Sequence, residues 1–152
     1  MLTLHPPVGH AWGMTELVAL DVDPGEDFLA ALDAAWQRGD AVLPLQRQAP
    51  ESHRRSVANR MGARWLVTMA GSEELSGSRP LAQGDALVMT TSGTTGAPKG
   101  VVLTHSAVEY SAYATATSLG IDPETHWLAC PPLSHVGGMS VITRALHTGA
   151  EL

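Results

Sequence analysis

Short apolar runs and segments with helical periodicity alternate along this chain, and this alternation limits its fold more than any other feature. Apolar runs typical of strands lie at residues 17–20, 41–45, 65–67 and 86–90, and helical segments follow the first two. A strand, a helix and a second strand in succession build a βαβ unit, in which the two strands run parallel. The expected fold class is therefore α/β, with a layered parallel βαβ sheet.

The clearest helical segment is predicted between Asp23 and Gly39. Asp23 followed by Pro24 is typical of an N-cap and a first helical position. Apolar side chains then recur on one helix face, at Phe28, Leu29, Leu32, Ala35 and Trp36. A second helix is predicted over 51–61, where Gly62 would end it.

The second half of the chain is predicted to continue this pattern after a surface connection at 71–84, which is rich in Gly, Ser and Pro. Residues 101–103 lead into a helix near 106–119, a strand is expected at 127–130, and a helix at 138–147. Residues 150–152 would begin one more strand. A length of 152 residues suits one domain or a piece of one, since domains commonly hold about 100 to 200 residues.

The charge and cysteine content exclude several functional classes. Nine Lys and Arg against 15 Asp and Glu give a formal charge of −6, which repels polyanions and argues against a general nucleic-acid binder. The single cysteine rules out an internal disulfide framework and fits a reducing compartment. The sequence starts without the features of a signal peptide, and no apolar run reaches membrane-span length. A cytoplasmic location is expected.

Six histidines and two arginines are interpreted as ordinary surface or capping residues. The histidines have no Cys, Asp or Glu partners at metal-ligand spacing, so no metal site is predicted among them; they are His5, His10, His53, His105, His126 and His147. Arg54 and Arg55 are interpreted as part of a solvated helix face.

The segment Thr91-Ser92-Gly93-Thr94-Thr95-Gly96-Ala97-Pro98-Lys99-Gly100 combines glycines, hydroxyl side chains and one lysine directly after a predicted strand. Glycines let backbone N–H groups approach an anion, and hydroxyl groups add donors or a metal ligand. Lys99 supplies a positive charge, whose hydrogen bond to an anion contributes about 1.5–3 kcal/mol. The segment therefore predicts a phosphate-binding loop.

Two common nucleotide-binding motifs do not fit this loop. The Walker loop needs four residues between its first glycine and a Gly-Lys-Ser/Thr triplet, but only two residues separate Gly93 from Gly96. The dinucleotide-binding motif needs a further glycine at a spacing that is absent here. A flexible Gly/Thr surface loop is the remaining alternative from composition alone.

Residues 92–105 resemble the phosphate-loop motif of the AMP-forming adenylate-forming enzymes, which include acyl-CoA synthetases, luciferases and peptide-synthetase adenylation domains. The resemblance implies that this loop wraps the β- and γ-phosphates of MgATP, and that Lys99 neutralises the pyrophosphate that leaves when a carboxylate attacks the α-phosphorus. The implied nucleotide-binding residues are Thr91, Ser92, Gly93, Thr94, Thr95, Gly96 and Lys99.

A second block, residues 130–139, is similar to the Pro-Leu-aromatic-His segment of the same family, although Ser134 replaces the usual aromatic residue. The resemblance implies that His135 lies near the substrate carboxylate and acts in catalysis with Lys99, and that Gly137 and Gly138 let the acyl chain pass close to the backbone. From the residue alone, His135 fits equally well as the cap of the following helix.

The function implied by the resemblance is ATP-dependent activation of a small-molecule carboxylic acid, followed by thioester formation with coenzyme A. The implied cofactors are ATP, Mg²⁺ and coenzyme A. The early position of the loop is similar to that in o-succinylbenzoate-CoA ligases. Residues 1–152 would be an incomplete N-terminal part of the large AMP-binding domain, inactive alone, without the rest of that domain and the small C-terminal domain.

Two alternatives to an acyl-CoA synthetase remain open at this point. The chain could belong to an adenylation domain that loads an acid onto a carrier protein, or it could be a noncatalytic remnant that binds a partner through an unpaired sheet edge. The particular acid, the acceptor and the oligomeric state are not fixed by the sequence.

Overall fold

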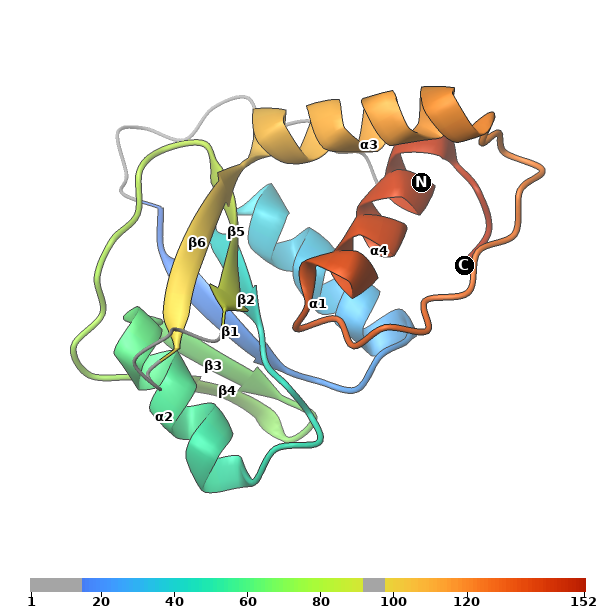
Figure 1. Cartoon of the computed structure of the whole chain (residues 1–152). Coiled ribbons are helices and arrows are strands. Elements are labelled where there is room, and N and C mark those ends of the chain that lie inside the picture. Colours follow the sequence, from blue (N-terminus) through green and yellow to red (C-terminus); the bar gives the residue numbers. More distant parts are fainter. Residues whose placement is uncertain (1–14, 92–97) are drawn as a thin grey trace.

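A six-stranded sheet with helices on both faces forms the framework of the protein, as the computed structural model shows for residues 15–91 and 98–152 (Figure 1). Its strand order is β4-β3-β1-β2-β5-β6. The strands are β1 (Leu17–Asp21), β2 (Ala41–Pro44), β3 (Trp65–Thr68), β4 (Gly71–Glu74), β5 (Asp85–Thr91) and β6 (Lys99–Thr104). The helices are α1 (Glu26–Gln37), α2 (Glu51–Met61), α3 (His105–Leu119) and α4 (Val136–Thr148).

The interior of the sheet is parallel, as the alternation of strands and helices predicted. Strand β1 pairs in parallel with both β2 and β3, and β2 pairs in parallel with β5. Strands β1 and β2 are buried along their whole length, because helices cover the two faces of the sheet. Strands covered on both faces consist of continuous apolar runs, which is why these were identifiable from sequence.

The two edges of the sheet differ from the expected all-parallel arrangement. Strand β4 runs antiparallel to β3, and β6 runs antiparallel to β5, so the sheet is mixed. The prediction of a plain surface connection at 71–84 is therefore wrong for 71–74, and 101–103 belong to a strand. Both edge strands are largely exposed, and so they lack the buried apolar run that marks an interior strand.

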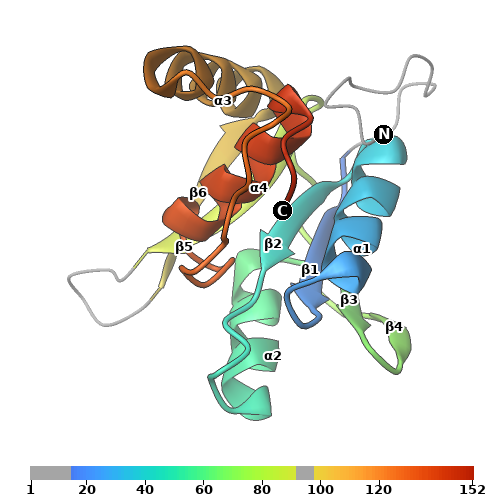
Figure 2. The same ribbon diagram turned by 90° about the vertical axis from the view of Figure 1, so that its right-hand side faces the viewer.

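Helices lie on both faces of the sheet (Figure 2). Residues of α1, α3 and α4 share one core cluster with β1, β2 and β5, in which Phe28, Leu32 and Met139 are fully buried. Helix α2 packs on the opposite face through a second cluster that includes Ala58, Leu43 and Val88. Among the helices described, none combines the length and the apolar character that a bilayer crossing needs.

The helix boundaries agree with the sequence in most cases but not at the start of α1. The N-cap of α1 is Gly25, and Asp23 instead pairs with Arg47. Helix α2 spans the predicted residues and ends at Gly62, whose φ of 78° is left-handed. The strand predicted at 127–130 is absent: His126 alone forms an isolated bridge, with Glu151.

Trp36 links α1 to β5, the strand that leads into the predicted phosphate loop. Its indole Nε1 donates a buried hydrogen bond of 3.0 Å to the carbonyl oxygen of Ala86 in β5. The indole ring also meets the His105 ring edge to face, with 5.2 Å between ring centroids. Burial of His105 lowers the pKa of its imidazole, because the charged form loses solvation there. The start of α3 and the start of β5 are thus both held against α1.

Candidate functional site

The carboxyl ends of the parallel strands β1, β2 and β5 meet at one edge of the sheet. Ligands of open α/β sheets bind outside this edge. A cavity of about 320 Å³ lies there, within the usual size range of a small-molecule site. Its polar lining residues are Gln46, His53, Arg54, Thr90, Thr91 and His135, and its apolar ones are Pro44, Leu45, Val57 and Pro98.

Two of the predicted site residues, Thr91 and His135, line this cavity together. They come from distant parts of the chain, the end of β5 and the N-terminus of α4. The structure therefore brings the beginning of the predicted phosphate loop next to the predicted substrate histidine. The predicted loop residues Ser92, Gly93, Thr94, Thr95 and Gly96 lie outside the described residues.

Lys99 lies directly across the β5–β6 pair from Thr91. The two residues are register partners, and the Thr91 hydroxyl donates to the backbone carbonyl of Lys99 at 3.4 Å. The Lys99 side chain is exposed and lines a separate groove of about 660 Å³, which adjoins the cavity at Pro98. No carboxylate is among the described residues that line either hollow, so both suit an anionic ligand better than a cationic one.

His135 occupies the N-cap position of α4, but its side chain makes no capping hydrogen bond in the described structure. Its backbone carbonyl accepts from the N–H groups of Gly138 and Met139, at 3.0 and 3.1 Å. His135 is thus the N-cap residue by position, as the alternative interpretation predicted, but its imidazole supplies no capping hydrogen bond to any described residue. His135 also lines the cavity, and its contact with a substrate carboxylate stays a prediction.

Gly138 is needed by the turn that leads into α4. A Cβ atom at this position would lie 2.4 Å from the carbonyl oxygen of Pro132 and 2.6 Å from that of Pro131. Backbone oxygens cannot yield as the end of a flexible side chain can. Close packing of the chain on itself thus accounts for this glycine, while passage of an acyl chain beside Gly137 and Gly138 remains a prediction.

Gly138→Ala is expected to lower the free energy of unfolding by about 1–3 kcal/mol, because the added methyl group forces the turn at 131–132 to move. Urea denaturation measures the change. Gly137→Ala is the matched control, since its Cβ would meet only the Pro131 Cβ, at 3.9 Å. Equal losses in the two variants would contradict the packing argument.

The sequence interpretation missed His53 and Arg54, both of which line the cavity from α2. Arg54 is not part of a solvated face: its guanidinium lies 2.7 Å from a carboxylate oxygen of Asp21, and its Nη1 donates to the carbonyl oxygen of Ala49 at 2.5 Å. A signal was present, because Asp21 is a charged residue at the end of an apolar run. Such a residue needs a partner when it is buried.

Asp21 is buried at the end of β1 between two guanidinium groups. Besides Arg54, Arg47 donates to its carboxylate at 2.6 Å. Arg47 also donates to Asp23 at 2.8 Å, and this hydrogen bond lowers the pKa of the Asp23 carboxyl group. The same two bonds raise the pKa of Arg47. This network joins the segments that follow β1 and β2 to α2, beside the cavity.

A resident metal centre is not evident in the part of the chain that the structure describes, where no three His, Cys, Asp or Glu side chains come together. The residues that line the cavity with neutral side-chain oxygens, a type of ligand that Mg²⁺ accepts, include Gln46, Thr90 and Thr91.

Comparison with known families gives one match, over the second half of the chain. The family described as AMP-binding enzyme matches residues 76–152. This range contains β5, β6, α3 and α4, together with Thr91, Lys99 and His135.

Individual relatives agree with this match. A 2-succinylbenzoate–CoA ligase of Bacillus mycoides (strain KBAB4) is 42% identical over 65 residues, which are 43% of this chain and 14% of the relative. The chain thus spans a small part of the length of the curated relatives it matches.

Solved structures show the same fold at low sequence identity. A variant of E. coli MenE with bound OSB-AMS has a TM-score of 0.71 and 23% identity, over 91% of this chain and 34% of that one. The long-chain-fatty-acid-CoA ligase FadD1 of Archaeoglobus fulgidus has a TM-score of 0.75 and 19% identity, over 91% of this chain and 35% of that one. Chains named for different acids therefore share this arrangement.

Proposed function

Because this chain belongs to the family of AMP-binding enzymes, we propose that it carries the phosphate-binding part of an enzyme that activates a carboxylic acid as its AMP ester. The observation that supports this most strongly is the position of Thr91, Lys99 and His135. Thr91 and His135 line one cavity at the carboxyl edge of the parallel strands, and Lys99, the register partner of Thr91, lines the groove that adjoins this cavity.

The proposed reaction begins with attack of a carboxylate oxygen of the acid on the α-phosphorus of ATP. A bond forms between that oxygen and phosphorus, and the bond from phosphorus to the bridging oxygen of the β-phosphate breaks. The products are the acyl-adenylate and pyrophosphate, which keeps the bridging oxygen. Mg²⁺ bound to the phosphates would screen their charge during this step.

The residues of this chain would bind and orient the reactants. Lys99 would neutralise the terminal phosphates, and the Thr91 hydroxyl would turn from the Lys99 carbonyl to donate a hydrogen bond to them. The loop residues Ser92, Gly93, Thr94, Thr95 and Gly96 are proposed to add amide and hydroxyl donors. The His135 imidazole would hold the carboxylate of the acid, with Gly137 and Gly138 beside the acyl chain.

The acid that we propose is an aromatic dicarboxylic acid of the 2-succinylbenzoate type, with coenzyme A as the thiol that accepts the acyl group. The name of the Bacillus relative, which is 42% identical over its matched segment, supports this choice. The fold by itself does not separate this acid from a fatty acid, since the fatty-acid ligase aligns as well. We place the reaction in the cytoplasm, where ATP is available.

An ATP–pyrophosphate exchange assay on the complete protein that carries residues 1–152 tests the proposal. We expect exchange that depends on the added acid, and that is fastest with 2-succinylbenzoate among aromatic, fatty and amino acids. Exchange with amino acids alone would favour an adenylation domain that loads a carrier protein. Absence of exchange with every acid, in a folded protein, would contradict acid activation.

A further inference from the structure

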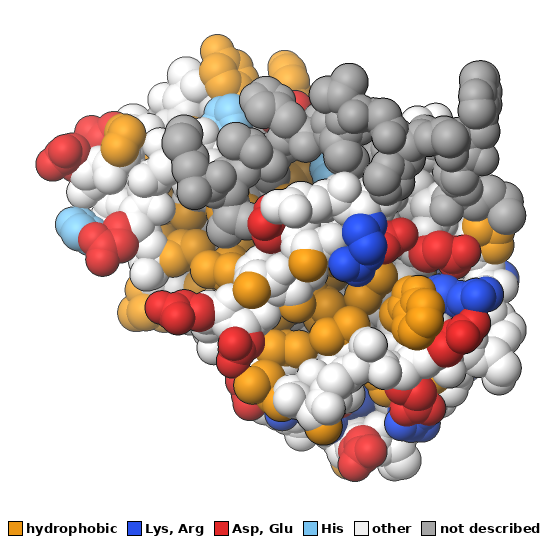
Figure 3. Space-filling view, turned by 180° about the vertical axis from the view of Figure 1, so that it is seen from behind, with side chains coloured by type: hydrophobic (Ala, Val, Ile, Leu, Met, Phe, Trp, Pro, Cys, Tyr) orange, Lys and Arg blue, Asp and Glu red, His pale blue; other side chains and the backbone are white. Residues whose placement is uncertain are grey.

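Most cationic side chains of this protein are neutralised by a partner, and the exceptions gather in one place. The chain contains eight arginines and one lysine. Five arginines form ion pairs with carboxylates; they are Arg38, Arg47, Arg54, Arg55 and Arg64. On the face seen from behind, basic and acidic side chains accordingly lie next to one another (Figure 3). A sixth, Arg144, lies over the ring of Trp127.

The remaining three cations, Arg60, Arg79 and Lys99, have no carboxylate within ion-pair distance in the described structure. Residues 1–14 and 92–97, which the structure does not describe, contain no Asp or Glu. These two segments therefore cannot supply a carboxylate to Arg60, Arg79 or Lys99. Three exposed positive charges without an acidic partner create a local positive potential, which attracts an anion even though the chain has a net charge of −6.

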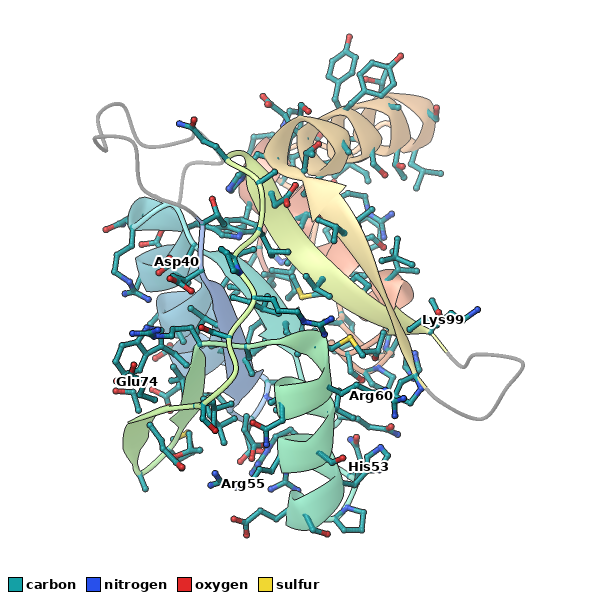
Figure 4. The ribbon with its side chains drawn as sticks, turned by 90° about the vertical axis from the view of Figure 1, so that its left-hand side faces the viewer. Asp40, His53, Arg55, Arg60, Glu74 and Lys99 are labelled. Atoms are coloured by element: carbon teal, nitrogen blue, oxygen red, sulfur yellow. The ribbon has the colours of Figure 1, made fainter. Side chains whose placement is uncertain are left out.

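All three of these cations line the groove of about 660 Å³ that adjoins the cavity. Arg60 comes from the last turn of α2, Arg79 from the connection between β4 and β5, and Lys99 from the first position of β6. Figure 4 shows Arg60 and Lys99 on neighbouring elements on the same side of the molecule. Three separate segments thus contribute a positive charge to one open hollow.

Arg79 is fixed in this groove by contacts along its length. Its Nη2 donates to the backbone carbonyl oxygen of Arg60. Its side chain also lies against Gly62, where an added Cβ would come within 2.8 Å of the Arg79 Nε. A guanidinium held in place loses little conformational entropy when it binds, and its planar donors match two oxygens of a phosphate group.

We propose that this groove is a binding site for pyrophosphate groups, in which Arg60 and Arg79 act together with Lys99. The proposal rests on the proposed function, in which acyl-adenylate formation releases pyrophosphate next to Lys99. The terminal phosphates of ATP have the same chemistry. The site would either hold these phosphates before the reaction or receive pyrophosphate after it.

Titration of the complete protein with inorganic pyrophosphate by calorimetry at low ionic strength tests the groove directly. Arg60→Gln and Arg79→Gln are each expected to weaken pyrophosphate binding about ten-fold, the loss of one charge-assisted contact. Arg55→Gln is the matched control, because Arg55 lies on the same helix α2 but pairs with Glu73. The pyrophosphate affinity of this variant is expected to stay within about two-fold of wild type, because surface substitutions away from a site change free energies by about 0.5 kcal/mol or less.

Because Arg79 packs on Gly62, Arg79→Gln changes a structural contact as well as a charge. Two other variants separate these effects. Arg60→Gln removes a charge without touching that packing. Arg79→Lys retains a positive charge and is expected to recover part of the affinity. Thermal unfolding of each variant separates lost binding from lost structure.

Parallel titrations with ATP and with AMP distinguish the two sources of phosphate. Weaker binding of both ATP and pyrophosphate, with AMP unchanged, would assign the groove to the terminal phosphates of ATP. Weaker binding of pyrophosphate alone would assign it to the departing product. Either outcome supports the site.

The proposal is overturned if wild-type protein does not bind pyrophosphate, or if Arg60→Gln and Arg79→Gln both bind it as Arg55→Gln does. Failure of the proposed function looks different. In that case, pyrophosphate binding would depend on Arg60 and Arg79 as expected, but the protein would not catalyse exchange with any acid.

Discussion

Lys99→Ala is expected to slow acyl-adenylate formation by about ten- to a thousand-fold in the complete enzyme, because a charge that opposes the developing pyrophosphate is lost. Lys99 is the only lysine in the chain, so no neighbouring lysine replaces it. Its side chain is exposed at the start of an edge strand, outside both core clusters. The rate of ATP–pyrophosphate exchange under saturating acid measures the effect.

The stability of the Lys99→Ala protein separates a catalytic effect from a structural one. Surface substitutions away from structural contacts change the free energy of unfolding by about 0.5 kcal/mol or less. We therefore expect a urea midpoint close to that of wild type. Exchange at the wild-type rate in this variant would remove Lys99 from the mechanism.

Asp21→Ala is expected to have the largest effect on stability, a loss of about 3–5 kcal/mol. The substitution leaves the guanidinium groups of Arg47 and Arg54 beside an apolar methyl group, with side chains that are 27% and 14% exposed. Arg47 keeps its bond to Asp23, which favours the lower end of this range. Urea denaturation followed by circular dichroism measures the loss.

Asp23→Ala provides the control for this prediction, because Asp23 shares the partner Arg47 but not the burial. The Asp23 side chain is 66% exposed, against 6% for Asp21. An exposed ion pair contributes about 1 kcal/mol or less. Similar losses in the two variants would show that burial of the Asp21 carboxylate is not what makes it important.

The interior of the fold was predictable from sequence because its strands are buried on both faces. Each such strand is an apolar run, and each helix between them has a periodic apolar face. The edge strands β4 and β6 were not predictable in the same way. Ser72, Glu73 and Glu74 have the composition of a surface loop, and Val101 and Val102 are both partly solvated in β6. Their strand conformation comes from antiparallel pairing with β3 and β5, which the composition of the edge strands does not reveal.

The candidate site was predictable where a motif carries it, and not where tertiary packing does. Thr91 and His135 were identified from ordered residue patterns, and the structure places both at one cavity. His53 and Arg54 lie on a helix whose periodicity indicates which residues avoid the core. That periodicity contains no information on which other segment faces them. Their contribution follows only from the packing of α2 beside the ends of β2 and β5.

One proline forms a shared wall between the cavity and the groove. Under the proposed assignments, the acid would bind at His135 on the cavity side of Pro98, while the terminal phosphates would extend from Thr91 toward the ammonium and guanidinium groups on the groove side. The acid and ATP would then occupy different volumes and would not compete for space. Steric exclusion would therefore not impose an order of binding on the two substrates. Pyrophosphate would be able to leave through the groove while the acyl-adenylate stays bound.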